Sequence, residues 1–314
     1  MAIASRFIEI PAASDAGTRI PVTTIEGDQP GFTLALVAGN HGYEYPPILA
    51  LQKLLREIHP VTLFGTVIMV HVANMPSFLG RTVYFSPVDG KNLNRCYPGR
   101  SDGTVSERIA HAITTEVIES ADCVLDLHCG DGNESLRPYV YQTVTADADL
   151  NRSIERIALA FGIDHIVIDR SRPTDPAGSV YCSNTAITRG KAAITVESGY
   201  LGCTDERCVD EIANGVLGVM RELGMLIEGP PPLERAVYLD PVEVISSPAT
   251  GILYPQVERG ESVTEGRALA RITDFFGAEL AEVRAPFAGE VLYIVATPPI
   301  TEGQPVGCVG AVRS

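Results

Sequence analysis

The amino-acid sequence predicts an α/β fold, with a mixed and mostly parallel sheet covered by helices on both faces, followed by a small C-terminal all-β barrel. Up to about residue 225, short apolar runs typical of buried strands alternate with stretches of helical periodicity. A proline-rich break follows near residue 230, and the rest of the chain has many glycines and prolines and little helical periodicity. Strands that alternate with helices indicate a sheet buried on both faces.

The strands and helices of the first part are predicted from apolar runs and from apolar residues three and four positions apart. The predicted strands are Thr33–Ala38, Thr66–Val72, Cys123–Leu127, His165–Ile168 and Ala192–Val196. The predicted helices are Pro47–Ile58, Ser106–Glu119, Leu150–Phe161 and Glu206–Leu223.

The stiff segment Gly229–Pro232 separates a predicted catalytic α/β domain, residues 1–230, from a predicted β domain, residues 231–314. Two half-motifs recur in the second domain. Pro248–Leu253 resembles Pro286–Val291 at an offset of 38 residues, and Thr264–Ile272 resembles Thr301–Val309 at an offset of 37. Matched offsets favour a barrel of two similar halves over a coincidence between glycine turns.

The charge of the chain argues against two classes of partner. Its 314 residues include 24 Lys and Arg against 39 Asp and Glu, which leaves a formal net charge of −15. A surface this acidic repels nucleic-acid phosphates and anionic membranes. The seven cysteines include no C-x-x-C pair, and neither a signal peptide nor a membrane-spanning run is evident. We therefore expect a soluble, cytoplasmic protein, with homo-oligomerisation left open.

Three predicted strands end in side chains able to bind a metal or transfer a proton. Thr33–Ala38 leads to His41 and Glu44, and the two later strands lead directly to His128 and to Glu197. Ligands of open α/β sheets bind outside the carboxyl ends of the strands. We therefore expect these four side chains to converge on one site.

Two histidines and one glutamate form a known ligand set for catalytic zinc, which leaves a fourth position open. His41 and Glu44 lie three residues apart at a strand-to-helix turn, which can direct both toward one metal. Zinc lowers the pKa of a bound water toward about 7 and polarises a carbonyl. Glu197 would then assist the attack of that water by taking its proton and passing it to the leaving amine.

Plainer interpretations exist for each residue taken alone. An isolated H-x-x-E pattern is common by chance, and a histidine at a strand end is more often a structural hydrogen-bonding group than a ligand. Glu197 by itself could be a neighbour of a helix N-cap. The convergence of three strand ends favours the metal site. The histidines assigned to structural roles are His59, His71, His111 and His165.

Several short motifs of this chain resemble those of a known family. The motifs, in chain order, are Gly39–Glu44, Asn74–Pro76, Arg81, Asn92–Arg95, Tyr97–Gly99, Asp126–His128 and Val196–Gly199. Together they resemble the succinylglutamate desuccinylase/aspartoacylase family, relatives of the zinc carboxypeptidases, over residues from about 30 to 200. The overall pattern, including Arg81 to Pro98, also resembles the N-acetyl-diaminobutyrate deacetylases of ectoine breakdown.

The resemblance implies a zinc-carboxypeptidase-like fold with one zinc ion per chain at His41, Glu44 and His128, and Glu197 as the proton shuttle. It further implies that Arg81 polarises the scissile carbonyl, and that Asn94 and Arg95 bind a substrate carboxylate. A guanidinium group suits the second role, because its planar fork donates two hydrogen bonds to a carboxylate. The plainer interpretation of Arg95 is a surface salt bridge.

Two positions depart from the family pattern. Many members have an aspartate, able to support a ligand histidine, where this chain has Asn92, so a backbone carbonyl or Asn92 itself must take that role. Arg81 lies 14 residues before Arg95, farther than in the shortest members. Asp126, two residues before His128, either supports that ligand or is simply a carboxylate at a strand end.

The repeat in the second domain resembles a biotinyl/lipoyl-type barrel. A carrier domain of that type needs a lysine at its hairpin tip. The lysines of this chain are Lys53, Lys91 and Lys191, so covalent biotin or lipoate is excluded. We expect the barrel to wall the active-site cleft or to form a subunit contact, with Phe275 and Phe276 as a lid, an interface anchor or a capped turn.

The sequence therefore predicts a zinc-dependent deacylase that hydrolyses the amide bond of a small N-acylated amino acid. One alternative is a metallocarboxypeptidase acting on short peptides. The other is a non-catalytic protein that binds zinc or a ligand. A panel of N-acyl amino acids and peptides separates the first two, and retained zinc without turnover identifies the third.

Overall fold

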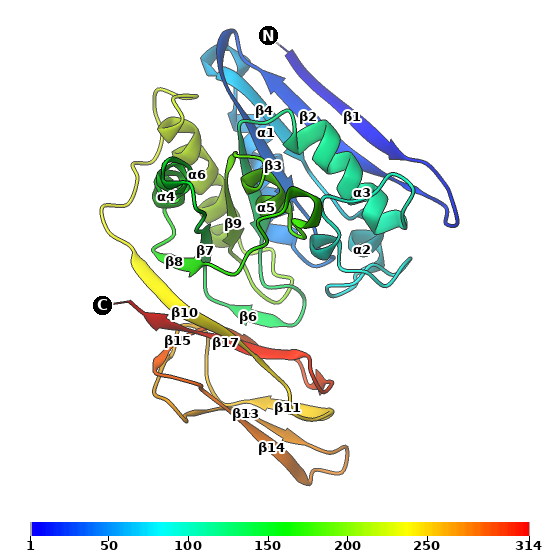
Figure 1. The fold of residues 1–314 in the computed structure, drawn as a ribbon, viewed down its shortest axis with the longest axis vertical. Coiled ribbons are helices and arrows are strands. Elements are labelled where there is room, and N and C mark those ends of the chain that lie inside the picture. The colour runs from blue at the N-terminus through cyan, green and yellow to red at the C-terminus, as the bar shows by residue number, and fades with distance from the viewer. Residues whose placement is uncertain (1, 314) are drawn as a thin grey trace.

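The computed structural model describes residues 2–313, and its largest feature is a mixed sheet of 13 strands. The strand order is β1-β2-β4-β3-β5-β9-β7-β8-β10-β17-β15-β12, and β6 pairs with β15. A chain of connected strands thus runs from the N-terminal edge of the protein into its C-terminal part (Figure 1). Because the sheet is continuous, strands of the C-terminal part belong to the same sheet as the strands that lead to the predicted site residues.

The centre of the sheet is parallel, as predicted. The neighbouring strands β3 (Gln29–Ala38), β5 (Cys123–His128) and β9 (Ala192–Glu197) all run in one direction. From Leu34 onward in β3, and in β5 and β9 apart from the partly exposed Ala192, the apolar side chains are almost fully buried, because helices cover both faces. The three carboxyl ends therefore lie side by side at one edge of the sheet, where the predicted site residues begin.

Helices lie on both sides of this sheet (Figure 1). The helices α1 (Tyr45–Glu57), α4 (Ala148–Phe161) and α6 (Glu206–Glu222) pack together, with α6 between the other two. The helix α5 (Cys182–Ile187) contacts β5 and β9, and α3 (Val105–Ile113) contacts β1. Local signals explain the ends of α4: Asp147 accepts backbone N–H groups at its start, and Gly162 ends it at a φ of 88°.

The predicted strands and long helices are all present, with small shifts at their ends. The helix predicted over Ser106–Glu119 changes character after Ile113, where a π-helical turn spans Thr114–Ile118. Several short or edge elements were not predicted. They are β1 (Ala2–Ile10), β2 (Thr18–Glu26), β6 (Glu134–Leu136), β7 (Tyr139–Thr143) and α2 (Met75–Gly80). The remaining strands of the α/β part are β4 (Phe64–Val70) and β8 (His165–Asp169).

The predicted closed C-terminal barrel is not confirmed. Strand β10 (Val237–Ser246) pairs in parallel with β8 and antiparallel with β17 (Pro305–Val312), so this region extends the main sheet. A separate antiparallel sheet follows the order β14-β13-β11-β16, and an apolar core fills the space between the two sheets. The strands are β11 (Gly251–Pro255), β12 (Ser262–Val263), β13 (Ala268–Thr273), β14 (Glu279–Arg284), β15 (Gly289–Val295) and β16 (Pro299–Ile300).

The internal repeat nevertheless has a structural counterpart. Its first copy forms β11 and β13, which pair in the separate sheet, and its second copy forms β15 and β17, which pair in the main sheet. Phe275 and Phe276 lie at the tip between β13 and β14, where they are 72% and 96% exposed. Asp274 Oδ1 accepts the backbone N–H groups of Phe276 and Ala278, so the tip is a capped turn.

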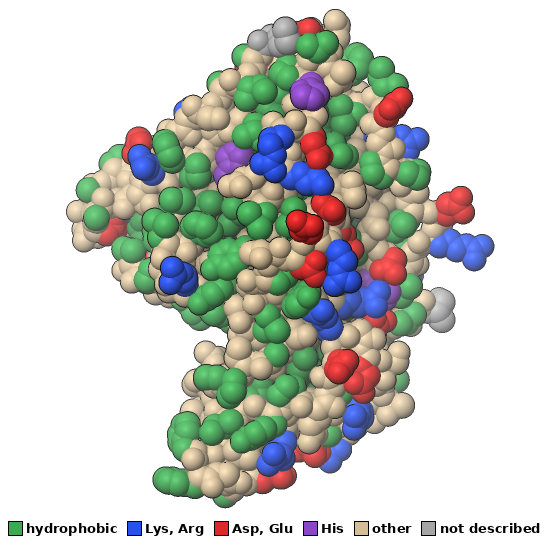
Figure 2. Space-filling view, turned by 180° about the vertical axis from the view of Figure 1, so that it is seen from behind, with side chains coloured by type: hydrophobic (Ala, Val, Ile, Leu, Met, Phe, Trp, Pro, Cys, Tyr) green, Lys and Arg blue, Asp and Glu red, His purple; other side chains and the backbone are tan. Residues whose placement is uncertain are grey.

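Charge is mixed on the face of the molecule that Figure 2 shows. Acidic and basic side chains are interspersed on the face seen in Figure 2 and do not gather there into one patch of a single sign. Among residues 2–313, none of the helices has both the length and the apolar character that a bilayer crossing requires.

Candidate metal and catalytic site

The first two candidate ligands lie in the turn that joins β3 to α1. Gly39 begins this turn with a φ of 72°, and a Cβ atom there would lie 3.2 Å from the Cα of Val72. The close approach and the positive φ both favour glycine. Glu44 is the last residue before α1, and its Oε2 accepts the backbone N–H of His41 at 2.9 Å. The turn therefore directs both side chains to the same side.

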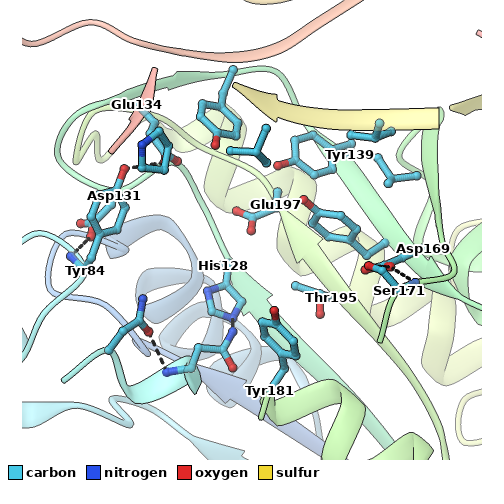
Figure 3. A pocket seen from close by; sticks show the side chains of 18 of the residues that line it. Tyr84, His128, Asp131, Glu134, Tyr139, Asp169, Ser171, Tyr181, Thr195 and Glu197 are labelled. Atoms are coloured by element: carbon cyan, nitrogen blue, oxygen red, sulfur yellow. Dashed lines mark hydrogen bonds between the residues drawn. The ribbon is translucent and has the colours of Figure 1, made fainter. Parts of the chain in front are cut away.

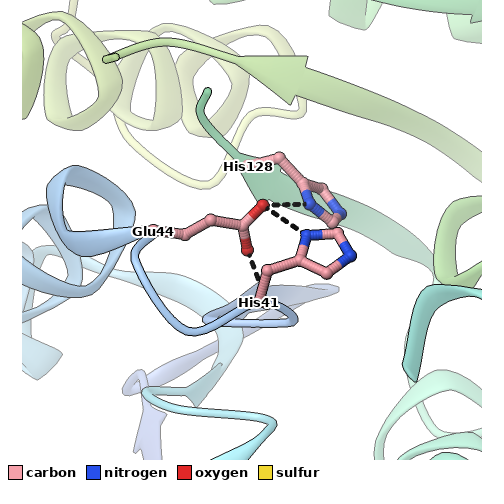
Figure 4. Close-up of side chains that lie close together, drawn as sticks. All are labelled: His41, Glu44 and His128. Atoms are coloured by element: carbon pink, nitrogen blue, oxygen red, sulfur yellow. Dashed lines mark hydrogen bonds and ion pairs between the residues drawn. The ribbon is translucent and has the colours of Figure 1, made fainter. Parts of the chain in front are cut away.

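His41, Glu44 and His128 form a compact cluster (Figure 4). The Nδ1 atoms of His41 and His128 lie 2.8 and 2.7 Å from Glu44 Oε1. One ligand atom from each residue lies within 4.8 Å of the others. Two imidazole nitrogens and one carboxylate oxygen at this spacing fit a zinc ion with an open coordination position.

The other ring nitrogen of each histidine has a partner of its own. His41 Nε2 lies 3.0 Å from Asn92 Oδ1, and His128 Nε2 lies 2.8 Å from Asp126 Oδ1. Each oxygen can accept an N–H, which leaves Nδ1 as the nitrogen that faces the cluster. Asn92 itself therefore takes the place of the aspartate that supports a ligand histidine in many family members. Asp126 contacts the ligand His128 and is not simply a carboxylate at a strand end.

The charges inside the cluster stabilise one another. Burial lowers the pKa of His41, but the neighbouring Glu44 carboxylate outweighs it and raises the pKa to about 9. Burial alone would raise the pKa of Glu44, yet the two histidines hold it below its usual range. The buried carboxylate of Glu44 stabilises positive charge on the two neighbouring imidazoles. The same negative charge suits the site to a bound cation.

Glu197 lies beside this cluster and lines the same cavity. It is directly opposite His128 in the register of β5 and β9. No hydrogen bond or ion pair joins its carboxylate to another residue within 2–313, and the side chain projects into the cavity (Figure 3). Burial raises the pKa of Glu197 to about 8, and Glu44 and Glu134 add to this effect. Such a group can exchange a proton near neutral pH.

A cavity of about 860 Å³ opens over the cluster. Its floor is formed by the strand ends, and part of its wall comes from β10, through Val242 and Val244, and from the loop before β17. The C-terminal region thus forms part of the cavity wall, which is one of the two roles expected for it. A cavity of this size suits a small molecule.

Asn94 and Arg95 both line this cavity. Asn94 is buried, with its Oδ1 accepting the Cys182 N–H at 2.9 Å and its Nδ2 lying 3.1 Å from His128 Nε2. Arg95 is exposed, and its guanidinium lies 4.6 Å from the ring centre of Tyr181. Arg95 therefore offers a charge to a ligand, whereas Asn94 is already engaged by its neighbours.

Arg81 lies elsewhere. It ends α2 with a φ of 50°, is exposed, and lines a separate cavity together with Tyr45 and Phe78. It is not among the residues that line the cavity over the cluster. Its role in polarising the scissile carbonyl stays a prediction that this position does not support.

Several cavity residues were not predicted from the sequence. Tyr84 has a φ of 59°, held by its N–H, which donates to Asp131 Oδ2 at 2.7 Å. Its hydroxyl donates to Glu134 at 2.6 Å, and burial raises the pKa of Glu134 to about 7 (Figure 3). Arg172 and Tyr181 also line this cavity. None of these residues carries a distinctive motif, and only the folded chain brings them together.

Two histidines assigned to structural roles do make structural contacts. His71 Nε2 lies 2.9 Å from Thr23 Oγ1, and His165 lies between Asp164 and Glu290. Neither histidine belongs to the metal-capable cluster. This supports the prediction that separates the two ligand histidines, His41 and His128, from the structural ones.

The fold and the cluster together define a candidate metal-dependent hydrolase of the α/β class. Comparisons with known proteins agree. Residues 30–223 match the succinylglutamate desuccinylase/aspartoacylase catalytic domain. The N-alpha-acetyl-L-2,4-diaminobutyric acid deacetylase of Halomonas elongata is 33% identical over 288 residues, which are 88% of this chain and 82% of that protein.

Solved structures show the same fold over nearly the whole chain. A succinylglutamate desuccinylase from Silicibacter sp. TM1040 superposes with a TM-score of 0.86 at 26% identity, covering 99% of this chain and 95% of the other. The product-bound ectoine utilization protein EutE (DoeB) from Ruegeria pomeroyi also gives a TM-score of 0.86, at 28% identity and 98% and 95% coverage. The chain belongs to the succinylglutamate desuccinylase/aspartoacylase family, whose members include deacylases of N-acylated amino acids.

Proposed function

We propose that this protein is a zinc-dependent hydrolase that cleaves the amide bond of a small N-acylated amino acid, with one zinc ion per chain at His41, Glu44 and His128. The observation that carries this proposal is the arrangement around the cluster. Three metal-capable atoms lie within 4.8 Å of one another, and Glu197, whose carboxylate has no hydrogen-bond or ion-pair partner among residues 2–313, stands opposite His128 at the floor of the cavity. This combination matches the needs of amide hydrolysis.

When bound, zinc supplies a Lewis acid that polarises the amide carbonyl and lowers the pKa of water. Glu197 takes a proton from the attacking water as the oxygen bonds to the carbonyl carbon. The carbon–nitrogen bond then breaks, and Glu197 returns that proton to the leaving nitrogen. The products are a carboxylate and a free amine. Burial of Glu197, which keeps its proton affinity high, supports both steps.

The substrate's carboxylate binds Arg95, whose guanidinium faces the cavity without a carboxylate partner among residues 2–313. Asn94 accepts the backbone N–H of Cys182 and helps to shape the same wall. The Halomonas relative's name supports an N-acetylated diamino acid as the first substrate to test. We place the reaction in the cytoplasm.

A substrate panel tests the proposal against its two alternatives. Zinc-loaded protein is incubated with N-acetyl amino acids, N-succinyl amino acids and short peptides, and the released amine is quantified. Release from acyl amino acids alone supports the deacylase. Cleavage of peptides alone supports the metallocarboxypeptidase. Retained zinc without any turnover, unaffected by Glu197→Gln, supports a binding protein.

A further inference from the structure

We propose that Asp169 masks the charge of Arg172, so that the cavity presents one uncompensated guanidinium and selects N-acyl amino acids that carry a single carboxylate. The inference rests on the proposed function, because it names the class of substrate for that site. It concerns the wall of the cavity formed by the end of β8 and the loop after it.

The Arg172–Asp169 pair is short and well shielded. Arg172 Nε donates to Asp169 Oδ2 at 2.5 Å, and the two side chains are only 13% and 11% exposed. The other carboxylate oxygen of Asp169 accepts both the N–H and the hydroxyl of Ser171 at 2.9 and 2.8 Å. Asp169 is thus held in one orientation, and a pair this shielded keeps most of its Coulomb attraction.

Aromatic rings hold Arg172 in place. Its guanidinium carbon lies 3.9 Å from the ring centre of Tyr181 and 5.3 Å from that of Tyr141. Stacking on these rings and the bond to Asp169 leave its two terminal nitrogens without a hydrogen-bond acceptor among residues 2–313. Arg172 lines the cavity, and the Arg172–Asp169 pair contributes no net charge to it.

The other two cavity arginines differ from Arg172. Arg95 shares the ring of Tyr181, yet within residues 2–313 it has no carboxylate partner. Arg170 is 54% exposed at the outer part of the wall, and its charge is opposed by Asp240 at 3.4 Å. Of the three guanidinium groups, Arg95 alone keeps an uncompensated charge, which suffices for one carboxylate.

A second carboxylate on the substrate would find no second guanidinium of this kind. Among the residues within 2–313 that line the cavity, Arg170 and Arg172 are each paired with an aspartate, so a second carboxylate would lose its water without gaining a protein cation as partner. The site should therefore accept a neutral or cationic side chain and discriminate against an acidic one.

Binding of two matched ligands tests this selectivity. N-acetyl-L-asparagine and N-acetyl-L-aspartate have nearly the same shape and differ by one negative charge. Their Kd values are measured by calorimetry on zinc-loaded full-length protein in a Glu197→Gln background, which slows hydrolysis. We expect the asparagine derivative to bind about tenfold more tightly or better, because the second carboxylate of the aspartate derivative loses its water without gaining a protein cation as partner.

Two substitutions should move this ratio in opposite directions. Asp169→Asn leaves Arg172 without its carboxylate partner. It should therefore strengthen binding of the aspartate derivative about tenfold relative to the asparagine derivative. Arg172→Gln leaves the carboxylate of Asp169 unpaired. It should weaken binding of the aspartate derivative by a similar factor relative to the asparagine derivative. Asp102→Asn removes the same charge at an exposed pair with Arg100 and controls for net charge. Circular dichroism and zinc content confirm that each variant is folded.

The outcomes separate the two proposals. An unchanged ratio in both Asp169→Asn and Arg172→Gln, or equal shifts with Asp102→Asn, overturns the masking of Arg172 and leaves the deacylase proposal standing. Failure of both ligands to bind the parent protein overturns the substrate class, and with it both proposals. Opposite shifts in the two variants, with no shift in the control, support the inference.

Discussion

Glu197 and His128 stand directly opposite each other at the carboxyl ends of the parallel strands β9 and β5. One residue of the pair joins the metal-capable cluster, and the other keeps a carboxylate free of protein partners within residues 2–313. Adjacent strand ends thus place a ligand and a proton-transfer group within reach of one small substrate.

Replacing Glu197 by glutamine should abolish turnover without releasing zinc. The amide keeps the size of the side chain but cannot accept the proton of the attacking water. We expect kcat to fall by about 10²–10⁴-fold, the usual contribution of a positioned general base. Steady-state kinetics and metal analysis check this. Glu206→Gln, at an exposed position on α6, is the matched control; full turnover in Glu197→Gln would refute the assignment.

Replacing Asp126 by asparagine should weaken zinc binding. Asp126 Oδ1 lies 2.8 Å from His128 Nε2 and holds the ring so that Nδ1 faces Glu44. Loss of such a partner costs roughly 10–100-fold in metal affinity. Competition with a chromophoric chelator measures the change. Asp122→Asn, one residue before the same strand, is the control, and equal affinities in the two variants would contradict the account.

The two arginines named from the sequence should behave differently. Arg95→Ala removes the charge that faces the cavity and should raise KM for an N-acyl amino acid by about tenfold or more, since charge-assisted hydrogen bonds are worth about 1.5–3 kcal/mol. Arg81→Ala, in a separate cavity, should leave KM and kcat nearly unchanged. A large loss of kcat in Arg81→Ala would restore its predicted role at the carbonyl.

The ion pair between Asp15 and Arg108 should make stability depend on pH. Arg108 Nη2 donates to Asp15 Oδ1 at 2.7 Å, and the hydrogen bond from Arg108 holds the pKa of Asp15 below its usual range. A carboxyl group whose pKa is lower in the folded state stabilises the protein above its unfolded-state pKa of about 4. That contribution disappears as the pH falls through the lower, folded-state pKa.

Asp15→Asn should therefore lower Tm by about 2–4 °C near neutral pH, with the difference closing in acid. Differential scanning calorimetry from pH 7 to pH 3 checks this. Glu116→Gln, at the exposed pair with Arg6, should change Tm much less. A Tm difference for Asp15→Asn that stays constant over the whole pH range would contradict the linkage.

Much of the α/β part was predictable because its signals are local. Buried parallel strands such as β5 read as continuous apolar runs, and α4 has both its cap residues in the sequence. The metal-capable cluster was predictable because each candidate follows a recognisable strand. The order of β3, β5 and β9 in the sheet then brings the three strand ends together.

The remaining features depend on contacts between distant segments. The repeat after residue 230 indicated a barrel, but it could not show that β10 pairs with β8 and carries the main sheet onward. Likewise Arg172 and Asp169 reveal their pairing only through the folded wall that also contains Tyr181. A division into domains at residue 230 stays a prediction, as does the assembly of subunits.

The most direct test of the account is a zinc titration of the metal-stripped protein, with amine release from an N-acetyl amino acid as the readout. The account predicts no activity without metal, a linear rise as zinc is added, and a plateau at one equivalent per chain. Full activity in the metal-stripped protein, or activity that does not respond to added zinc, would contradict it.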